Sequence, residues 1–287
     1  MEDKGSLSLH FEGDIVQDHL VSARTLGKSL VHTQNAIDRA YLDLKYGNLW
    51  KYARMRGEDY PVADFIALYP KEGGFVQQLL SATGRQIVNR ISSALTPAME
   101  KVLAEGEDVA SSMSQQVENR KKQLVHGIVE PKHFQELIEN PGEKVIRTYA
   151  DRSINREIDQ VLSIIRSRNS GESFLEIETH GDKSHKYEFN KYKSEKFHSI
   201  VSRREIGKPV IYVARVRQLD RDRLNGKVVN LENNKTVMVH FLNEKDFVKA
   251  HPYLGNNKEM VFVGAPVIEY GAFDPNAGDI YFIDLLR

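Results

Sequence analysis

The chain contains no cysteine among its 287 residues. This absence excludes disulfide bonds, thiolate nucleophiles and cysteine zinc sites. The chain also has no surplus of either charge, because its 40 Lys and Arg residues equal its 40 Asp and Glu residues. A protein that coats nucleic acid without sequence preference normally shows a basic excess, so any phosphate-binding surface has to be local.

Long apolar runs are lacking as well. The longest one, residues 260–268, is far shorter than the ~20 residues that span a bilayer. The first residues, Met1 to Lys4, do not have the basic and then apolar profile of a secretory signal. We therefore expect a soluble, cytoplasmic protein that does not enter a membrane.

Catalytic motifs are also missing. The sequence has no phosphate-cradling glycine loop, no Gly-x-Ser-x-Gly elbow and no His-Glu-x-x-His pair. It therefore favours a protein that is not an enzyme and that has no cofactor, no metal and no catalytic residues. One alternative stays open, a divergent metal-dependent nuclease built from acidic residues and a lysine, namely Asp64, Glu72, Glu176, Glu178 and Lys186.

The segment 208–287 has the pattern strand, strand, strand, short helix, strand, strand. Residues 210–219 alternate in polarity, and Asn225-Gly226 and Asn233-Asn234 are turn signals. Asn243 is a suitable N-cap for a helix over 244–250. This order predicts a small β-barrel of OB-like type, with an SH3-like barrel or an open sheet as alternatives.

The N-terminal half predicts a small sheet with long helices. Residues 6–12 alternate as a strand, 18–44 carry a helical apolar stripe, and 62–69 with 75–80 form a hairpin around Gly73-Gly74. Helical stripes then fill the middle of the chain as far as Ile165. Trp50 and Tyr52, between the first helix and the hairpin, are interpreted as edges of the core.

A break at Asn169-Ser170-Gly171 ends the last of these helices, and a hairpin over 174–189 follows. We therefore predict an N-terminal α+β and helical domain over 1–170, and a domain over 171–287 that contains this hairpin and the OB-like barrel. The fold class is α+β, with a small N-terminal sheet, long helices, a helical middle and a C-terminal small barrel.

One amphipathic stripe has two interpretations. It either packs inside its own domain or joins two copies of the chain, which would make the protein a homo-oligomer, most simply a dimer. The residues of this candidate interface are Val109, Met113, Val117 and Leu124.

A basic strip is the best candidate for a ligand surface. Single-stranded nucleic acid is bound by cationic grooves with aromatic platforms. The strip is also explained as a solvated face balanced by interleaved carboxylates such as Asp220 and Asp222. The candidate nucleic-acid-binding residues are Arg215, Arg217, Arg221, Arg223, Lys227 and Tyr253, with Tyr192 and Phe197 as further stacking surfaces.

Four short segments carry a family resemblance. They are 6–13, beginning Ser-Leu-Ser-Leu-His-Phe, then 26–30, 69–75 and 226–229. With them the chain resembles an uncharacterised protein family found in bacterial genomes and mobile elements. The resemblance implies no activity and no catalytic residues, but genes of this kind often lie near phage-defence or counter-defence loci.

These observations lead to a functional prediction. We expect a non-enzymatic binding or regulatory protein that acts on a protein partner, in the context of phage–host defence or counter-defence. The first alternative is a single-stranded nucleic-acid-binding module that uses the OB-like barrel, and the second is the nuclease named above.

Overall fold

The computed structural model describes residues 3–47, 49–71, 73–104, 111–255 and 258–286. The chain forms two compact units. The first, called the sheet unit, comprises Met1–Leu49, Ala53–Glu107 and Ala150–Ser202. The second, called the barrel unit, comprises Trp50–Tyr52, Asp108–Tyr149 and Arg203–Arg287. Within the described ranges, no helix has both the length and the apolar character needed to cross a membrane.

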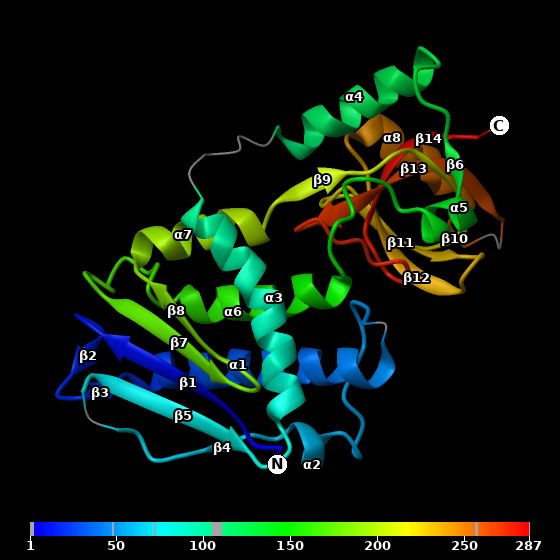
Figure 1. The fold of residues 1–287 in the computed structure, drawn as a ribbon. Helices are drawn as coiled ribbons and strands as arrows, with labels where there is room; N and C mark the ends of the chain where they lie inside the picture. Colours follow the sequence, from blue (N-terminus) through cyan, green and yellow to red (C-terminus); the bar gives the residue numbers. More distant parts are fainter. Residues whose placement is uncertain (1–2, 48, 72, 105–110, 256–257, 287) are drawn as a thin grey trace. The chain divides into compact units, whose positions relative to one another are not determined.

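The sheet unit is built on a five-stranded sheet whose strand order is β4-β5-β1-β7-β8. Every neighbouring pair in it is antiparallel (Figure 1). The strands are β1 (Gly5–Glu12), β4 (Ile66–Ala67), β5 (Phe75–Ser81), β7 (Phe174–His180) and β8 (Ser184–Phe189), and a two-stranded ribbon is formed by β2 (Val16–Gln17) and β3 (Leu20–Val21).

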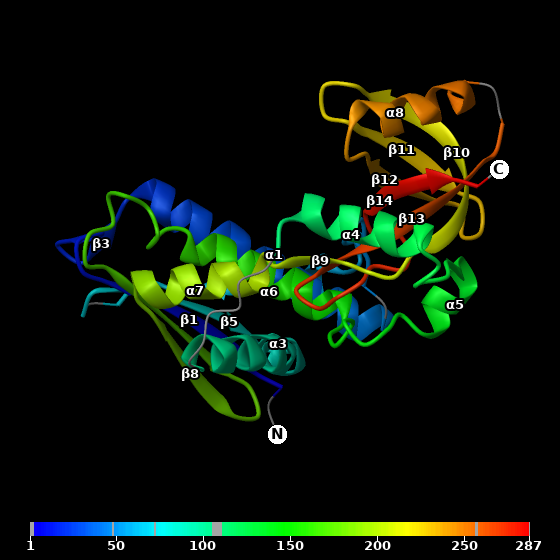
Figure 2. The same ribbon diagram turned by 90° about the horizontal axis from the view of Figure 1, so that it is seen from above.

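Helices cover one face of this sheet. The burial pattern of β1 shows which of its residues point toward the covered face. Leu7, Leu9 and Phe11 of β1 are wholly buried, whereas the alternate residues of β1 face the other side. Helix α3 packs on β1 and β7, and α1 and α7 pack on α3 (Figure 2). The helices are α1 (Ala23–Tyr46), α2 (Tyr60–Ala63), α3 (Arg85–Leu103), α6 (Tyr149–Leu162) and α7 (Lys191–Val201).

The strand pairing places the domain boundary differently from the predicted break at 169–171. Strand β7 pairs with β1 along seven residues, and β8 pairs with β7. The hairpin predicted to begin a second domain therefore belongs to the N-terminal sheet. Conversely, the segment Asp108–Tyr149 lies in the barrel unit. The predicted split into 1–170 and 171–287 missed both exchanges, because each depends on contacts between residues far apart in the sequence.

The C-terminal region forms a closed five-strand β-barrel, and the chain as a whole is mixed α and β, with eight α-helices among its described residues. Around the barrel the order is β10-β11-β12-β14-β13, and β13 closes it by pairing with β10. The pairs β10–β11, β11–β12, β13–β14 and β10–β13 are antiparallel, and β12–β14 is parallel. The barrel strands are β10 (Val210–Asp220), β11 (Asn225–Asn230), β12 (Lys235–His240), β13 (Met260–Glu269) and β14 (Ile280–Leu285).

Short elements complete this unit. Helix α8 (Glu244–Ala250) lies between β12 and β13 in the chain and is followed by a 3-10 turn, η1 (His251–Tyr253). Strand β6 (Lys132–His133) joins β10, and β9 (Arg204–Ile206) joins β13. Helices α4 (Met113–Val125) and α5 (Phe134–Glu139) precede the barrel in the chain.

Aromatic side chains fill the barrel. Tyr212, Phe262 and Phe282 stack in series, with ring centroids 5.5 and 5.7 Å apart. Phe247 of α8 and Phe134 of α5 join the same core cluster. Gly264 permits this packing, because a Cβ there would lie only 2.5 Å from Ile280 Cγ2. The register of β13 also shifts between Val263 and Gly264, where a glycine allows a strand to bend.

The stripe on α4 is covered within the chain. Val117 is fully buried against Val263, Ala265 and Ile283 of the barrel, and Met113 and Leu124 pack at the edge of the same cluster. These three side chains are therefore occupied inside the barrel unit and are not free for a second copy. Val109, the fourth residue of the predicted interface, lies outside the described residues. That the protein is a homo-oligomer stays a prediction, but Met113, Val117 and Leu124 no longer support it.

A charge at this position tests the packing. Val117→Asp should lower the free energy of unfolding by about 3 kcal/mol or more, because it buries an unpaired carboxylate in an apolar contact. Chemical denaturation measures the change. The control Val125→Asp alters an 82% exposed residue of the same helix and should change stability little. Equal effects of the two variants would show that α4 does not pack as described.

Candidate functional site

The predicted cationic residues Arg215 and Arg217 both lie on the outer surface of β10. Arg215 pairs with Val229 on β11, and Gln218 pairs with Lys227. The register shifts between Val216 and Gln218, so Arg217 is the extra residue of a β-bulge. Lys227 is two residues from Val229, which puts it on the same face of β11. The structure therefore brings Arg215, Arg217 and Lys227 onto one surface.

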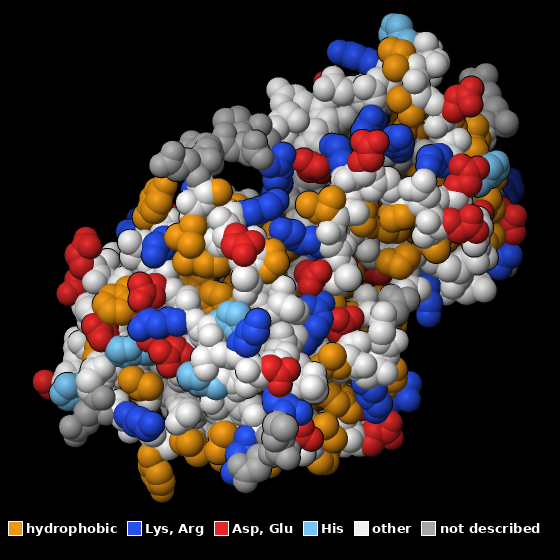
Figure 3. Space-filling model, in the orientation of Figure 1, with side chains coloured by type: hydrophobic (Ala, Val, Ile, Leu, Met, Phe, Trp, Pro, Cys, Tyr) orange, Lys and Arg blue, Asp and Glu red, His pale blue; other side chains and the backbone are white. Residues whose placement is uncertain are grey.

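Most of the predicted arginines have carboxylate partners. Arg215 lies 3.4 Å from Glu259, Arg223 lies 3.9 Å from Asp220, and Arg221 pairs with Glu244. None of the ion pairs found among the described residues involves Arg217 or Lys227. Figure 3 shows the same interspersion of positive and negative side chains on the face that it draws. Arg217 and Lys227 are therefore the cations of the predicted strip with the least compensation.

The predicted stacking residues differ in exposure. Tyr253 is half-buried against the barrel core, and Phe197 of α7 is fully buried in the sheet unit. Tyr192 is 65% exposed and belongs to the sheet unit. Part of the Tyr253 side chain is therefore used in core packing, and its role as a stacking surface stays a prediction.

A different aromatic pair lies on the barrel unit. The rings of Trp50 and Tyr52 meet edge to face, with centroids 5.9 Å apart. The ammonium group of Lys235, at the start of β12, lies 5.0 Å from the centre of the Trp50 ring. Tyr52 is 45% exposed and Trp50 is half-buried. A surface with two adjacent rings and a cation is the kind on which nucleobases stack.

Lys51 fixes this aromatic pair to the barrel. Its backbone N–H donates to Asp274 Oδ2 at 2.8 Å, and its ammonium group donates to Asp279 Oδ1 at 2.5 Å. The other oxygen of Asp279 lies 3.1 Å from His240 Nε2 on β12. Asp274 is itself rigid, since its second oxygen accepts the backbone N–H groups of Asn276 and Ala277.

The contact with Lys51 and His240 lowers the pKa of Asp279. Burial by itself would raise the pKa of Asp279, but hydrogen bonds from His240 and Lys51 outweigh it and lower the pKa to about 2. Burial opposes the charge of Lys51, yet its bond to Asp279 prevails and raises the pKa of Lys51 above its ordinary value. Both groups therefore stay charged over the whole neutral range.

Sequence reasoning had placed Trp50 and Tyr52 at the edge of the core. The available signal was the pattern Trp50-Lys51-Tyr52, in which a lysine lies between two aromatic residues. The acceptors of Lys51 are more than two hundred residues away in the chain. No local pattern in the sequence connects them.

The open face of the sheet unit holds a second group of polar residues. Glu176 is 8% exposed, and its carboxylate lies 2.6 Å from the Lys186 ammonium and 3.9 Å from His10 Nδ1. Glu178 is adjacent on the same face of β7. A hollow of about 540 Å³ lies here, lined by His10, Glu12, Phe174, Glu176, Lys186, Glu188, Phe189, Asn190 and Lys193.

This geometry brings together only part of the predicted nuclease set. Glu176, Glu178 and Lys186 meet, but Asp64 lies at the end of α2 near Asp38 of α1, and Glu72 is outside the described residues. The Glu176 carboxylate raises the pKa of Lys186, so this lysine is held as a cation. Among the residues whose positions are described, no three His, Asp or Glu side chains are arranged to hold a metal ion.

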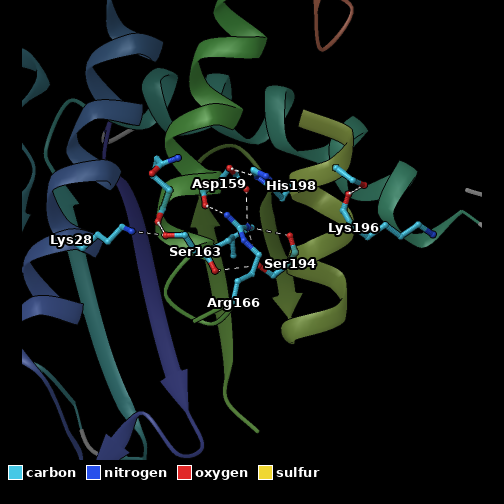
Figure 4. Close-up of polar contacts among 10 residues, drawn as sticks. Lys28, Asp159, Ser163, Arg166, Ser194, Lys196 and His198 are labelled. Carbon is cyan, nitrogen blue, oxygen red and sulfur yellow. Dashed lines mark hydrogen bonds and ion pairs between the residues drawn. The ribbon is translucent and has the colours of Figure 1, made fainter. Parts of the chain in front are cut away.

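A third polar cluster joins α6 and α7 (Figure 4). The buried carboxylate of Asp159 lies 2.7 Å from Arg166 Nη1 and 2.9 Å from His198 Nδ1. Arg166 also donates to the backbone oxygen and the hydroxyl of Ser194, at 3.1 Å each. Nearby, the Lys28 ammonium donates to the Ser163 hydroxyl at 2.6 Å.

The residue types of this cluster suggest a Ser-His-Asp arrangement, but the contacts do not. Ser194 is fully buried, and its hydroxyl donates to the backbone oxygen of Leu162. Ser163 donates to the backbone oxygen of Gln160. Neither hydroxyl has His198 as a partner in these contacts, so no base is positioned to activate a serine. The cluster instead anchors α7 to the C-terminal end of α6.

No family model matches the chain, and the comparisons with curated proteins and with solved structures found no match either. The predicted resemblance to a mobile-element family therefore stays a prediction. Function has to be argued from the geometry of the two units.

The anchoring role of Asp159 is testable. Asp159→Asn removes the charge that faces Arg166 and His198, and it should lower the free energy of unfolding by about 3 kcal/mol because a buried cation loses its partner. Urea denaturation followed by circular dichroism measures this. Asp182→Asn is the control, since that side chain is 60% exposed. A stable Asp159→Asn variant would contradict the anchoring role.

The Asp279 contact predicts a pH dependence. The pKa of Asp279 is lower in the folded protein than its ordinary value of 3.8, so its contribution is complete above about pH 4 and is lost as the pH falls toward 2. The contribution at neutral pH is about 2 kcal/mol. Emission of Trp50, the single tryptophan, should therefore shift between about pH 4 and 2.

The variant Asp279→Asn isolates this titration. It should shift the Trp50 emission already at neutral pH, and it should remove the part of the acid transition that Asp279 causes. Far-UV circular dichroism serves as the control for global unfolding. Identical acid transitions in the two proteins would show that Lys51 does not hold the segment through this carboxylate.

Proposed function

We propose that the C-terminal barrel is of OB type and that the protein is a non-enzymatic binder of single-stranded nucleic acid. The order of the strands supports the first part. Around an OB barrel the strands are arranged in the order first, second, third, fifth, fourth, and β10-β11-β12-β14-β13 have this order here. Along the chain, a helix separates the third strand from the fourth, as α8 does here. The parallel β12–β14 pair and the antiparallel β10–β13 closure fit the same topology.

The position of the aromatic pair supports the second part and carries the proposal. OB barrels bind oligonucleotides across their second and third strands, between the loops that follow the first and fourth strands. Here these strands are β11 and β12. The β13–β14 loop supplies Asp274, which holds the Trp50–Tyr52 segment next to Lys235 of β12. The aromatic pair therefore borders the surface that such barrels use.

Cations border the other side of this surface. Lys227 of β11 pairs in register with Met238 of β12, and Arg217 lies in the adjoining bulge of β10. Arg221 and Arg223 lie in the β10–β11 turn, with side chains 74% and 80% exposed. A single strand that crosses from Arg217 and Lys227 to the Trp50 ring would have phosphate contacts at one end and base stacking at the other.

The charges also set the expected strength. Arg217, Lys227 and Lys235 are the cations that we expect to contact phosphate, because Arg215, Arg221 and Arg223 are already paired with carboxylates. Each phosphate contact on a single strand lowers the slope of log K against log salt by about 0.7, so a total slope near −2 is expected. Binding should accordingly be modest and sensitive to salt.

Binding of a protein partner is the second candidate. It is supported by the open face of the sheet unit, where Glu12, Glu176 and Glu188 surround Lys186 and His10 beside the ring of Phe174. A hollow of about 540 Å³ with charged walls is suited to a side chain of a partner. A role in phage–host conflict stays a prediction.

Nucleic-acid binding is tested with an unlabelled oligothymidylate. It should quench the emission of Trp50, and anisotropy of a labelled strand should give the affinity of each variant. Loss of a stacked ring costs about 1–3 kcal/mol, so Trp50→Ala and Tyr52→Ala should each weaken binding about 5- to 150-fold. Tyr192→Ala, which removes an exposed ring of the sheet unit, is the control and should bind normally.

Charge variants refine the same test. The double variant Arg217→Ala with Lys227→Ala should weaken binding and make the salt slope shallower by about 1.4. Arg221→Ala, whose side chain is already paired with Glu244, should have a smaller effect. No salt-dependent binding at low ionic strength, or unchanged affinity in Trp50→Ala, would overturn the proposal and leave the protein partner as the function to pursue.

A further inference from the structure

A hollow is also present in the barrel unit, between α4 and β9, two elements that pack together (Figure 2). Its volume is about 310 Å³, at the lower end of the range for small-molecule pockets. It is separate from the β11–β12 surface described above. The lining residues are Ser111, Gln116, Asn119, Arg120, Gln123, Lys144, Arg203, Glu205 and Ile206.

Arg120 is the central feature of this hollow. Its Nε–H donates to the backbone oxygen of Gly207 at 3.0 Å, and Nη1 donates to Gln123 Oε1 at 2.7 Å. Both acceptors are neutral, and none of the ion pairs among the described residues involves Arg120. Burial lowers the pKa of Arg120, with no carboxylate to oppose the shift. A half-buried guanidinium without a counter-ion is costly unless something supplies the negative charge.

The neighbouring charges do not supply it. Among the described residues of the lining, Glu205 has the only carboxylate, and two other cations share it. One oxygen lies 2.9 Å from Arg203, and the other lies 3.4 Å from Lys144. The described lining residues therefore carry three cationic side chains and one carboxylate. The excess of positive charge is local, since the chain as a whole has none.

The side-chain amides of the lining also favour an anionic ligand, because they leave donors free rather than acceptors. Gln116 is already used, because its Oε1 accepts the Ile206 N–H at 2.9 Å and its Nε2 donates to the Ser111 carbonyl at 3.0 Å. The side-chain amide of Gln123 accepts from Arg120, which orients its NH₂ group as a donor. The hollow thus presents the remaining guanidinium N–H groups, amide NH₂ groups and ammonium protons, and few acceptors.

We propose that this pocket binds a phosphate monoester, with Arg120 as its principal contact. A guanidinium matches the spacing of two phosphate oxygens, and three terminal oxygens of a monoester satisfy several donors at once. The volume of about 310 Å³ exceeds what a bare ion occupies and leaves space for a small organic group. The site is independent of the proposed nucleic-acid surface, because it uses α4 and β9 instead of β11, β12 and the Trp50–Tyr52 segment.

The experiment uses isothermal titration of the full chain with inorganic phosphate and with ribose 5-phosphate, and with sodium chloride at matched ionic strength as the blank. Both phosphates should bind, and the ester should bind more tightly. Arg120→Gln should weaken both at least tenfold. Lys122→Gln removes one exposed cation from the same helix and should leave both affinities unchanged. If Arg120→Gln fails to fold, Lys144→Gln, at a 46% exposed side chain, should still weaken binding several-fold.

Two sources of the phosphate group are distinguished by a further comparison. A 5′-phosphorylated oligonucleotide that competes with ribose 5-phosphate, while its unphosphorylated form does not, identifies the ligand as a strand terminus. If neither oligonucleotide competes with ribose 5-phosphate, the ligand is a free phosphorylated metabolite. No binding of either phosphate, or equal loss in Arg120→Gln and Lys122→Gln, would overturn the pocket. Trp50→Ala should leave phosphate binding intact, so failure of the nucleic-acid proposal would be seen separately.

Discussion

The contact between Lys51 and Asp279 is the interaction on which the proposed nucleic-acid surface depends. The ammonium and the carboxylate lie 2.5 Å apart, and the backbone N–H of Lys51 is held by Asp274. Without them the Trp50–Tyr52 segment would have no fixed position on the barrel, and two aromatic rings would lose the order that makes stacking favourable. Because ordering a residue costs about 1–2 kcal/mol in backbone entropy, a charge-assisted pair of this kind is needed to keep such a short segment in place.

Local pattern predicted the barrel strands closely. The expected strand over 210–219 and helix over 244–250 agree with β10 and α8 nearly residue for residue, since alternation and an Asn cap are read from neighbours in the chain. The domain boundary was wrong because β7 pairs with β1, which no local signal reveals. Helix α7 was missed for a different reason. Only Ser194, Phe197 and Val201 are buried along it, so it carries too few apolar residues to form a clear helical stripe.

The candidate site shows the same division. The outward direction of Arg215 and Arg217 followed from their spacing, but the bulge at Arg217 and the partners of Arg215 and Arg221 did not. Tyr253 was chosen as a platform by residue type, and its burial depends on how η1 meets the barrel core. Trp50 and Tyr52 were assigned to the core for the same reason. An aromatic side chain is equally suited to a core and to a stacking surface, and only tertiary contacts decide between them.

Neutrality of the whole chain conceals where its positive charge is uncompensated. Exposed pairs such as Arg221–Glu244 are worth little to stability, but each carboxylate offsets part of the positive potential that would attract phosphate. What remains are cations that lack a carboxylate, and these differ in setting. Arg217 and Lys227 are exposed, so water and salt screen them and any attraction to phosphate should fall steeply with ionic strength. Arg120 is half-buried, where screening is weaker, so an anion in its pocket should resist salt better than a strand on the barrel surface.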